Sequence, residues 1–270
     1  MDLGIEGKWA LVCGASKGLG FGCASALVQA GVNVIINARG EQALQSASAA
    51  LAQVATAYSG SQPKVVPVAA DITTTAGRAA VFDKARELKI DFDIVVTNAG
   101  GPPPGDFREW DRDAWVKAVD ANMLTPIELI RATVDGMAER GFGRIINITS
   151  SAVKAPIATL GLSNGARSGL TGFVAGVART DVAARGVTIN NLLPGKFDTD
   201  RLASSRAIAA NKAGVSEDEI VARQKLEIPA RRFGTPAEFG ATCAFLCSVH
   251  AAYITGQNVL LDGGMYQGTY

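Results

Sequence analysis

A glycine-rich segment near the amino terminus has residue types and spacing that suit phosphate binding. It reads Cys13-Gly-Ala-Ser-Lys-Gly-Leu-Gly20, after an apolar stretch and before an alanine-rich one. Glycine lets the backbone turn tightly and approach a pyrophosphate, and the amides at a helix start favour negative charge. The same glycines also suit an ordinary tight turn, so the strand-to-helix context is what predicts a dinucleotide site. The expected contacts come from Gly14, Ser16, Lys17, Gly18, Leu19 and Gly20.

The choice between the two nicotinamide cofactors depends on the end of the second expected strand, Ile36-Asn37-Ala38-Arg39. Enzymes that bind NAD(H) commonly place a carboxylate there for the ribose hydroxyls, and this segment has none. Arg39 and Lys17 can instead form charge-assisted hydrogen bonds to a 2′-phosphate, although both also suit solvated surface positions. We therefore expect NADP(H) rather than NAD(H).

Two further segments directly follow expected strands. Asp71-Ile72 comes after the third strand and is expected to flank the adenine. Asn98-Ala99-Gly100 comes after the fourth and is expected to line the floor beneath the nicotinamide ribose, although Asn98 also suits the plain role of capping a turn. Both expectations rest on the rule that ligands of open α/β sheets bind beyond the carboxyl ends of the strands.

The elements that must position these segments are short β-branched runs alternating with alanine-rich helical stretches. This alternation predicts repeated βαβ units, and the dense apolar character of the strands suits a parallel sheet that is covered on both faces. We expect an α/β fold with a doubly wound parallel sheet of about seven strands in three layers. The expected strands are 9–13, 32–37, 64–69, 93–97, 144–149, 188–192 and 258–261.

Length and composition limit the number of domains and the class of partner that we expect for this chain. Its 270 residues, of which 48% are hydrophobic, suit one domain covering residues 1–270. A polar, partly helical insertion at about 196–229 lies beyond a strand's carboxyl end, where insertions usually shape a substrate pocket. The formal net charge of +1 gives no general attraction to nucleic acid or an anionic membrane, so we expect a small-molecule partner.

The first residues, the lengths of the apolar runs and the positions of the cysteines predict a cytoplasmic protein. No apolar run is long enough to span a bilayer, and the first residues lack the pattern of a signal peptide. The four cysteines lie on apolar segments without Cys-x-x-Cys spacing, and the chain has one histidine. We therefore expect buried free thiols and no metal site.

Taken in order, these segments resemble the short-chain dehydrogenase/reductase family, in the branch of the 3-oxoacyl-acyl-carrier-protein reductases. The resemblance covers almost the whole chain and implies a Rossmann-type fold, a nicotinamide cofactor, and a homotetramer or dimer. It adds Pro194 and Gly195 to the expected cofactor contacts. The matching segments are Gly14–Gly20, Asp71-Ile72, Thr97–Gly100, Asp120–Asn122, Ile145–Ser150, Asn191–Gly195, Ile254–Gly256 and Asp262–Gly264.

The resemblance also implies the catalytic residues, and here the match is partial. It implies that Asn122 supports a water relay and that Ser150 hydrogen-bonds the substrate carbonyl, while a tyrosine beside a lysine acts as acid or base. In this chain the tyrosine position holds Ser163 and the lysine position holds Arg167, which as a lysine replacement is also expected to contact the cofactor ribose. The four tyrosines lie elsewhere, at positions 58, 253, 266 and 270.

The two replacements have different physical consequences. An arginine can supply positive charge and hydrogen bonds, but an ordinary guanidinium pKa above about 12 prevents proton donation near neutrality. Ser163 can donate a hydrogen bond, yet an unassisted aliphatic hydroxyl lacks the acidity of a phenol. Losing a general acid typically costs about 10²–10⁴-fold in rate, which hydride positioning and carbonyl polarisation by Ser150 can partly survive.

Three hypotheses follow from this altered site. The first is a working NADPH-dependent reductase of a carbonyl compound, 3-oxoacyl-like or a ketone, that takes its proton from water or from Lys154 or Lys196. The second is reduction of a conjugated C=C bond, such as that of an enoyl thioester, in which the enolate needs hydrogen-bond donors more than immediate protonation. The third is a nucleotide-binding protein that has lost catalysis and acts as a sensor or a structural subunit.

Overall fold

The computed structural model describes residues 1–269 and has a seven-stranded, fully parallel sheet at its centre. The strand order is β3-β2-β1-β4-β5-β6-β7, which confirms the expected doubly wound fold. Every strand lies within two residues of its expected bounds. The strands are β1 (Trp9–Cys13), β2 (Asn33–Ala38), β3 (Val65–Ala69), β4 (Ile94–Thr97), β5 (Gly143–Ile148), β6 (Val187–Pro194) and β7 (Asn258–Leu261).

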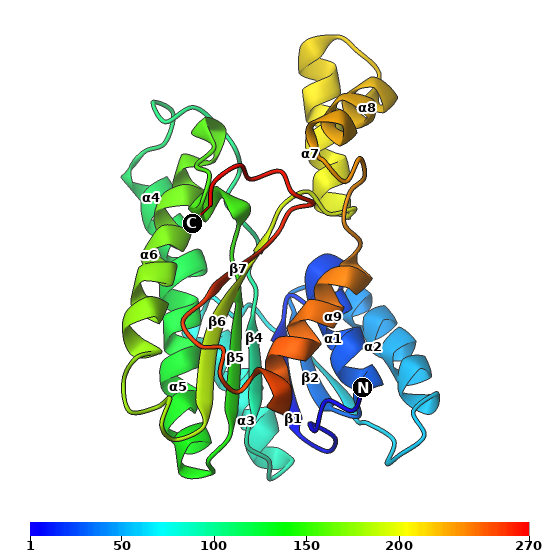
Figure 1. The fold of residues 1–270 in the computed structure, drawn as a ribbon, viewed down its shortest axis with the longest axis vertical. Helices are drawn as coiled ribbons and strands as arrows, with labels where there is room; N and C mark the ends of the chain where they lie inside the picture. The colour runs from blue at the N-terminus through cyan, green and yellow to red at the C-terminus, as the bar shows by residue number, and fades with distance from the viewer. Residues whose placement is uncertain (270) are drawn as a thin grey trace.

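Helices cover both faces of the sheet, as Figure 1 shows. One face carries α1 (Gly18–Gln29), α2 (Glu41–Thr56) and α9 (Pro236–Cys247). The other carries α3 (Thr75–Glu87), α4 (Arg112–Val119), α5 (Thr125–Glu139) and α6 (Gly161–Val177). Within residues 1–269, no helix combines the length and the apolar character that crossing a membrane requires.

The core is two apolar layers, one on each face of the sheet. Alternate strand residues point to opposite faces, so Val12 packs toward α1 and α9 while Leu11 packs in the layer that contains α5 and α6. Helices α1 and α9 approach closely because Gly22 and Gly240 face each other, and a Cβ on either would overlap the opposite backbone. All four cysteines are buried free thiols, as expected.

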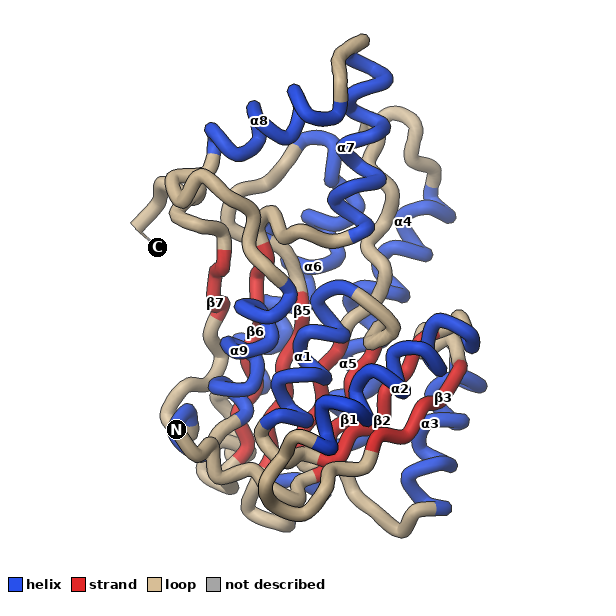
Figure 2. The backbone as a smooth tube through the Cα atoms, turned by 90° about the vertical axis from the view of Figure 1, so that its right-hand side faces the viewer, coloured by secondary structure: helices blue, strands red, loops and turns tan. Residues whose placement is uncertain are grey.

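The carboxyl ends of the strands form one edge of the molecule, and the strand order reverses there between β1 and β4. The expected insertion folds into α7 (Asp200–Ala213) and α8 (Glu217–Glu227). These two helices stand above this edge, and the segment after β7 also crosses it (Figures 1 and 2). A crevice at the carboxyl edge of a parallel sheet, at the point where strand order reverses, is the usual ligand site of such folds.

A ladder of polar side chains crosses four strands beneath this edge. Thr97 donates to Asn147 at 2.7 Å, Asn147 donates to Asn191 at 3.1 Å, and Asn191 donates to Asn258 at 2.8 Å. The four residues are in register across β4, β5, β6 and β7. Thr97, Asn147 and Asn191 are at most 2% exposed, so each needs a hydrogen-bond partner within the protein. Because they supply these partners to one another, they fix the register of the strands under the site.

Candidate active site

The glycine loop between β1 and α1 has the backbone that a pyrophosphate cradle needs. Gly14 and Gly18 adopt positive φ angles of 60° and 59°, which side chains rarely allow. A Cβ at Gly14 would come within 2.6 Å of the Asn98 amide nitrogen, and a Cβ at Gly20 would overlap the Gly14 carbonyl. The start of α1 has no side-chain cap, so its first amides remain available to an anion.

The residues expected to surround the cofactor line up along this same edge. Asn98 donates to the Gly14 carbonyl at 3.5 Å, which joins the loop after β4 to the glycine loop. Asp71 accepts two hydrogen bonds from Thr73 and holds the turn after β3, while Ile72 is buried. Gly195, at the end of β6, lies so close to Asp262 that a Cβ would contact it at 2.7 Å.

The two cations expected at the 2′-phosphate have different surroundings. Arg39 is exposed just beyond β2 and has no ion pair or hydrogen bond within residues 1–269. Lys17 donates to the Asp200 carboxylate at 2.9 Å, and both side chains are about 70% exposed. Lys17 therefore ties the glycine loop to the first turn of α7, a contact between residues 183 positions apart that the sequence did not indicate.

Ser150 is the first residue after β5 and Thr149. Its extended backbone places the side chain as the cap of the short turn Ser151–Val153, where its hydroxyl accepts from the Ala152 amide at 3.1 Å. The hydroxyl proton of Ser150 is not used by this contact, and the side chain is half-buried. Ser150 can therefore donate to a substrate oxygen.

Ser163 and Arg167 lie one turn apart on α6 and contact each other. Arg167 donates from Nη1 to the Ser163 hydroxyl at 3.0 Å. Ser163 is 3% exposed. Burial, with a smaller contribution from the positive charge of Arg201, lowers the pKa of Arg167 to about 10. The guanidinium is thus a better acid than its ordinary pKa above 12 suggests, although it stays protonated near neutrality.

The Ser163–Arg167 contact has a chemical consequence. A hydroxyl that accepts a charge-assisted hydrogen bond can still donate its own proton onward. Arg167 and Ser163 are therefore joined as donors in series, from guanidinium to hydroxyl and from hydroxyl outward.

Asn122 lies in a π turn, Asp120–Leu124, that interrupts the helix formed by α4 and α5. Its side chain is 5% exposed and donates to the Ala118 carbonyl at 3.3 Å. Such turns widen the helix by one residue and are frequent at functional sites. This contact uses one of the two amide protons, so a relay through Asn122 can use the other proton, the side-chain oxygen or the backbone.

The two lysines considered as proton donors both have other contacts. Lys196 forms an ion pair with Glu227 of α8 at 2.6 Å. The Lys154 ammonium lies 5.7 Å from the centre of the Tyr266 ring. Neither lysine contacts Ser163 or Arg167, so the structure brings neither to the altered pair.

Arg201 is one of several cations in the insertion for which the sequence favoured a solvated position, and its contacts at the site were not predicted. It lies in the first turn of α7 and donates to the carbonyls of Gly101 and Pro102 at 3.2 and 3.3 Å. These carbonyls belong to the loop after β4, so the insertion reaches across the edge of the sheet. Among the many cations of residues 196–229, only the folded arrangement distinguishes this one, because no local motif marks it.

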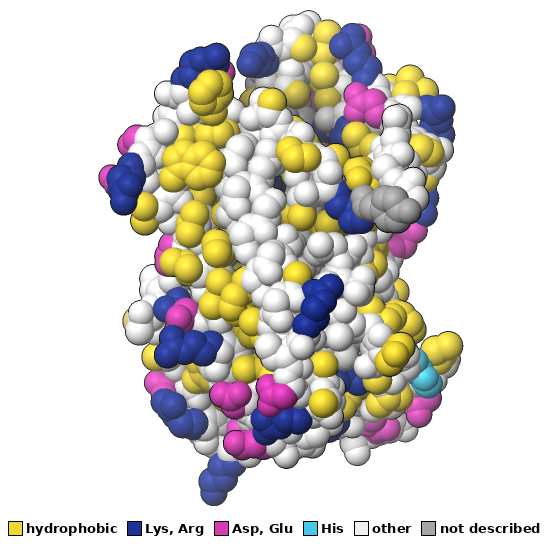
Figure 3. Space-filling model, turned by 60° about the vertical axis from the view of Figure 1, so that its left-hand side comes forward, with side chains coloured by type: hydrophobic (Ala, Val, Ile, Leu, Met, Phe, Trp, Pro, Cys, Tyr) yellow, Lys and Arg dark blue, Asp and Glu magenta, His cyan; other side chains and the backbone are white. Residues whose placement is uncertain are grey.

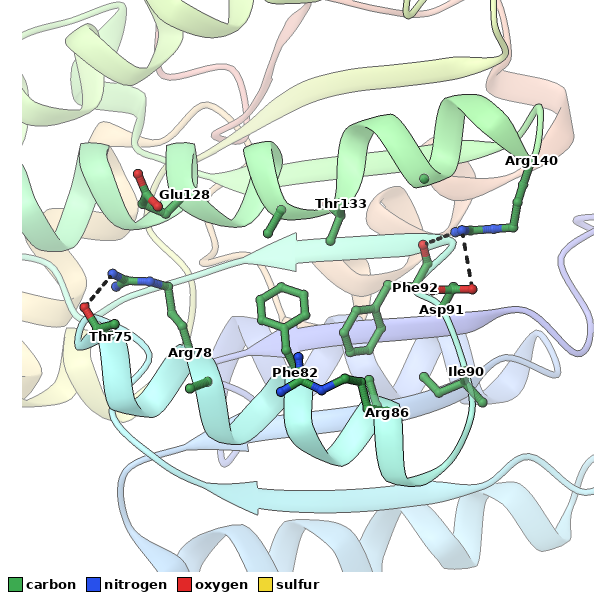
Figure 4. Close-up of a pocket in the computed structure, with 14 residues that line it drawn as sticks. Thr75, Arg78, Phe82, Arg86, Ile90, Asp91, Phe92, Glu128, Thr133 and Arg140 are labelled. Atoms are coloured by element: carbon green, nitrogen blue, oxygen red, sulfur yellow. Dashed lines mark hydrogen bonds and ion pairs between the residues drawn. The ribbon is translucent and has the colours of Figure 1, made fainter.

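One groove lies away from this edge, and none of the expected site residues lines it. It has a volume of about 600 Å³ and lies between α3 and α5, where Figure 4 shows Phe82 and Phe92 at its floor and Arg78, Arg86 and Arg140 around it. Within residues 1–269, no three His, Cys, Asp or Glu side chains are grouped as metal ligands would be.

Comparison with known proteins decides the family. A family model described as Enoyl-(Acyl carrier protein) reductase matches residues 14–266. The chain belongs to the short-chain dehydrogenase/reductase family. It is an oxidoreductase of that family with a nicotinamide cofactor, and its Rossmann-type fold is that of its relatives.

Individual relatives match over most of their length. The chain is 33% identical to the 3-oxoacyl-[acyl-carrier-protein] reductase of Vibrio cholerae over 98% of this chain and 99% of that protein. It is 34% identical to the acetoacetyl-CoA reductase of Cupriavidus necator over 73% of this chain and 74% of that one. The structure of L-sorbose reductase from Gluconobacter frateurii with NADPH and L-sorbose superimposes with a TM-score of 0.91 and 28% identity, covering 99% and 100% of the two chains.

Proposed function

We propose that this short-chain oxidoreductase is an NADPH-dependent reductase of a carbonyl substrate, 3-oxoacyl-like or a simple ketone, with a site that works without the family's tyrosine. The observation that carries the proposal is the hydrogen bond from Arg167 to Ser163, at 3.0 Å, in the positions of the missing lysine and tyrosine. Relatives named as 3-oxoacyl-[acyl-carrier-protein] and acetoacetyl-CoA reductases support the carbonyl assignment.

The residues at the edge of the sheet fit NADP(H). The positive-φ glycines and the uncapped start of α1 suit the pyrophosphate. Exposed Arg39, which has no ion pair within residues 1–269, suits the 2′-phosphate. Bound NADPH would supply a hydride to the substrate carbon. The remaining proposed contacts are Ser16, Leu19, Asp71, Ile72, Asn98, Ala99, Gly100, Pro194 and Gly195.

The protein's own groups would stabilise charge on the substrate oxygen. Ser150 donates its free hydroxyl proton to that oxygen, and Ser163 donates from the other side while accepting from Arg167. Two fixed donors aimed at a developing oxyanion need no reorganisation during the reaction, which is how such sites lower a barrier. A proton that leaves Ser163 is replaced through its contact with the Arg167 guanidinium or by water.

NADPH oxidation over a substrate panel tests this proposal. Purified protein is assayed with matched 3-oxoacyl thioesters, 2-enoyl thioesters and simple ketones, beside Ser150→Ala. The proposal predicts carbonyl turnover that Ser150→Ala lowers about 10²–10³-fold, the usual cost of removing one oxyanion donor. Binding of NADPH without turnover on any class, or turnover indifferent to Ser150→Ala, would contradict it.

A second candidate, reduction of a conjugated C=C bond, is favoured by the same pair. An enolate needs hydrogen-bond donors, and Ser163 backed by Arg167 is a donor that lacks a phenol's ease of protonating oxygen. The description of the matching family model is also that of an enoyl reductase. In the panel above, faster turnover of 2-enoyl than of 3-oxo thioesters would select this reaction over carbonyl reduction.

A third candidate is a nucleotide-binding protein without catalysis. The joined Ser163–Arg167 pair and the free proton of Ser150 argue against it, because both keep donors in the pocket. Turnover that depends on Ser150 would exclude it.

A further inference from the structure

The hydroxyl of Thr125, the first residue of α5, is buried without a partner. The side chain is 2% exposed, and within residues 1–269 its oxygen takes part in no hydrogen bond. Buried hydroxyls are ordinarily hydrogen-bonded, because an unsatisfied one has lost its hydration and gained nothing in return. Thr125 directly follows the π turn that contains Asn122, so this unsatisfied hydroxyl adjoins an expected site residue.

Thr133, on the same helix, shows what a buried helical threonine ordinarily does. Its hydroxyl donates to the carbonyl of Leu129, four residues earlier, at 2.8 Å. A threonine can make this contact because its side chain points back over the preceding turn of the helix. For Thr125 the corresponding carbonyls are those of Ala121 and Asn122 in the π turn, and its hydroxyl bonds to neither of them directly.

The same stretch of backbone is short of amide donors. The amide of Thr125 donates to the carbonyl of Asp120, five residues earlier, as a π turn requires. The next residue, Pro126, has no N–H and therefore cannot donate to the carbonyl of Ala121 or of Asn122. The following amide can serve only one of these two carbonyls. At least one carbonyl is thus left without a main-chain donor, under the side chain of Thr125.

One buried water would satisfy this set of groups. Such a water typically makes about three hydrogen bonds to otherwise unsatisfied polar groups, and the Thr125 hydroxyl and the free carbonyl supply two of them. The π turn packs against α6, where a Cβ at Gly169 would come within 2.7 Å of the Met123 sulfur. Arg167 lies two residues before Gly169, and its contact with Ser163 uses one of its five N–H donors. Helix α6 therefore has donors to offer as the third partner.

We propose that Thr125 is a positioning residue of the reductase site, and that its hydroxyl and the free π-turn carbonyl hold a buried water that reprotonates the Ser163–Arg167 pair. Ser163 gives a proton to the substrate oxygen, Arg167 returns one to Ser163, and the water returns one to Arg167 and takes one from solvent. One proton thus enters for each hydride that the cofactor supplies. The inference rests on the proposed function and adds a residue outside the expected site set.

Stability distinguishes a bound water from a dry hydroxyl. Thr125→Val keeps the shape of the side chain and removes the hydroxyl. A dry, unsatisfied hydroxyl is costly, so its removal would raise the midpoint of urea unfolding. With a bound water the midpoint should fall, because the variant takes one hydrogen bond away from the water. A midpoint equal to or above that of the wild type would overturn the proposal.

Turnover tests the positioning role. In NADPH oxidation, Thr125→Val should lower kcat about tenfold with KM little changed, as for loss of one hydrogen bond in the relay. Thr125→Ser keeps the hydroxyl and should recover most of this loss. Thr188→Val is the matched control, because Thr188 on β6 is equally buried without a partner but does not adjoin the π turn. Its kcat should equal that of the wild type.

A second variant tests the free carbonyl rather than the hydroxyl. Pro126→Ala returns an amide donor to the turn, so the carbonyl is occupied and kcat should fall as in Thr125→Val. Ser150-dependent turnover that is the same in the wild type, Thr125→Val and Pro126→Ala would overturn the inference and leave the reductase standing. A lowered urea midpoint in Thr125→Val, with no turnover by the wild type, would support the buried water and count against the reductase.

Discussion

At the scale of single residues, the proposed mechanism places the reaction's proton on Ser163, with Arg167 behind it. An arginine side chain ordinarily has too high a pKa to act as an acid, but burial and the charge of Arg201 lower the pKa of Arg167 to about 10. That value is close to the ordinary pKa of a tyrosine phenol, the acid that the proposed site lacks. In the proposed site, the buried hydroxyl of Ser163, which accepts from Arg167, would lie between this acid and the substrate.

This pKa predicts a pH dependence. In the folded protein Arg167 loses its proton at a lower pH than a free guanidinium does, so kcat/KM should fall as the pH rises through about 10. Arg201→Gln removes the neighbouring charge and should move this alkaline limb to higher pH. Steady-state profiles from pH 8 to 11 measure both effects, and a limb that stays in place in Arg201→Gln would refute the assignment to Arg167.

We expect cofactor choice to depend most on Arg39, which has no carboxylate partner within residues 1–269. Arg39→Asp places a carboxylate where NAD-binding enzymes commonly have one, so the ratio of NADPH to NADH affinity should fall about tenfold or more. Fluorescence titration with both nucleotides measures the ratio. Arg179→Asp, two residues beyond the end of α6, is the control that makes the same change in charge. Unchanged selectivity in Arg39→Asp would refute the 2′-phosphate contact.

At the scale of elements, the insertion is held at two points of the site. Asp200 and Arg201 are adjacent on the first turn of α7, yet they contact loops that follow different strands. Asp200 pairs with Lys17 in the loop after β1. Arg201 donates to Gly101 and Pro102 in the loop after β4. Helix α7 therefore spans the edge between β1 and β4, where the strand order reverses. The position of α7 depends on polar contacts rather than on the packing of an apolar face, because Ala210 is the one residue of this helix that is buried.

We expect the Lys17–Asp200 ion pair to compete with the cofactor for Lys17. If Lys17 contacts the 2′-phosphate, Asp200→Asn releases it, and NADPH should bind about two- to fivefold more tightly while NADH affinity is unchanged. Backbone amide exchange in α7 should speed up at the same time. Asp198→Asn, which breaks the adjacent pair with Arg206, serves as the control. Weaker NADPH binding in Asp200→Asn would show that the pair supports the cofactor site instead.

The strands and the helices between them were predictable because they are local and periodic. Apolar runs of five or six residues predicted β1 and β5 to within one residue. The glycine loop was predictable for the same reason, since its spacing is contiguous. The contacts of Lys17 with Asp200 and of Arg201 with Gly101 join residues 183 and 100 positions apart, and no pattern in the sequence marks such partners.

At the scale of the whole molecule, one face carries exposed apolar side chains. Figure 3 shows hydrophobic side chains gathered on the face that carries α4 and α6. The exposed members include Phe107, Val116 and Leu124, at 63%, 54% and 44% exposure. Exposed apolar side chains that cluster on one face commonly mark an interface. The expected homo-oligomer, a tetramer or dimer, would cover this face.

A charge placed in this face tests the association. Val116→Asp should shift the protein toward monomer, because it would bury an unpaired carboxylate in the interface. Ile208→Asp, at 65% exposure on α7, places the same charge on an equally exposed hydrophobic residue outside the face. Sedimentation equilibrium of both variants and the wild type reports the mass. A wild-type monomer, or an unchanged oligomer in Val116→Asp, would contradict this role for the face.

The most direct test of the altered site is a double-mutant cycle in kcat for NADPH oxidation, using Ser163→Ala, Arg167→Met and the double variant. Groups that act in series are non-additive, so each single variant should lose about 10²-fold and the double variant little more. That result would show that Ser163 and Arg167 act as one donor in place of the missing tyrosine. Wild-type kcat in Ser163→Ala, or fully additive losses, would contradict the account.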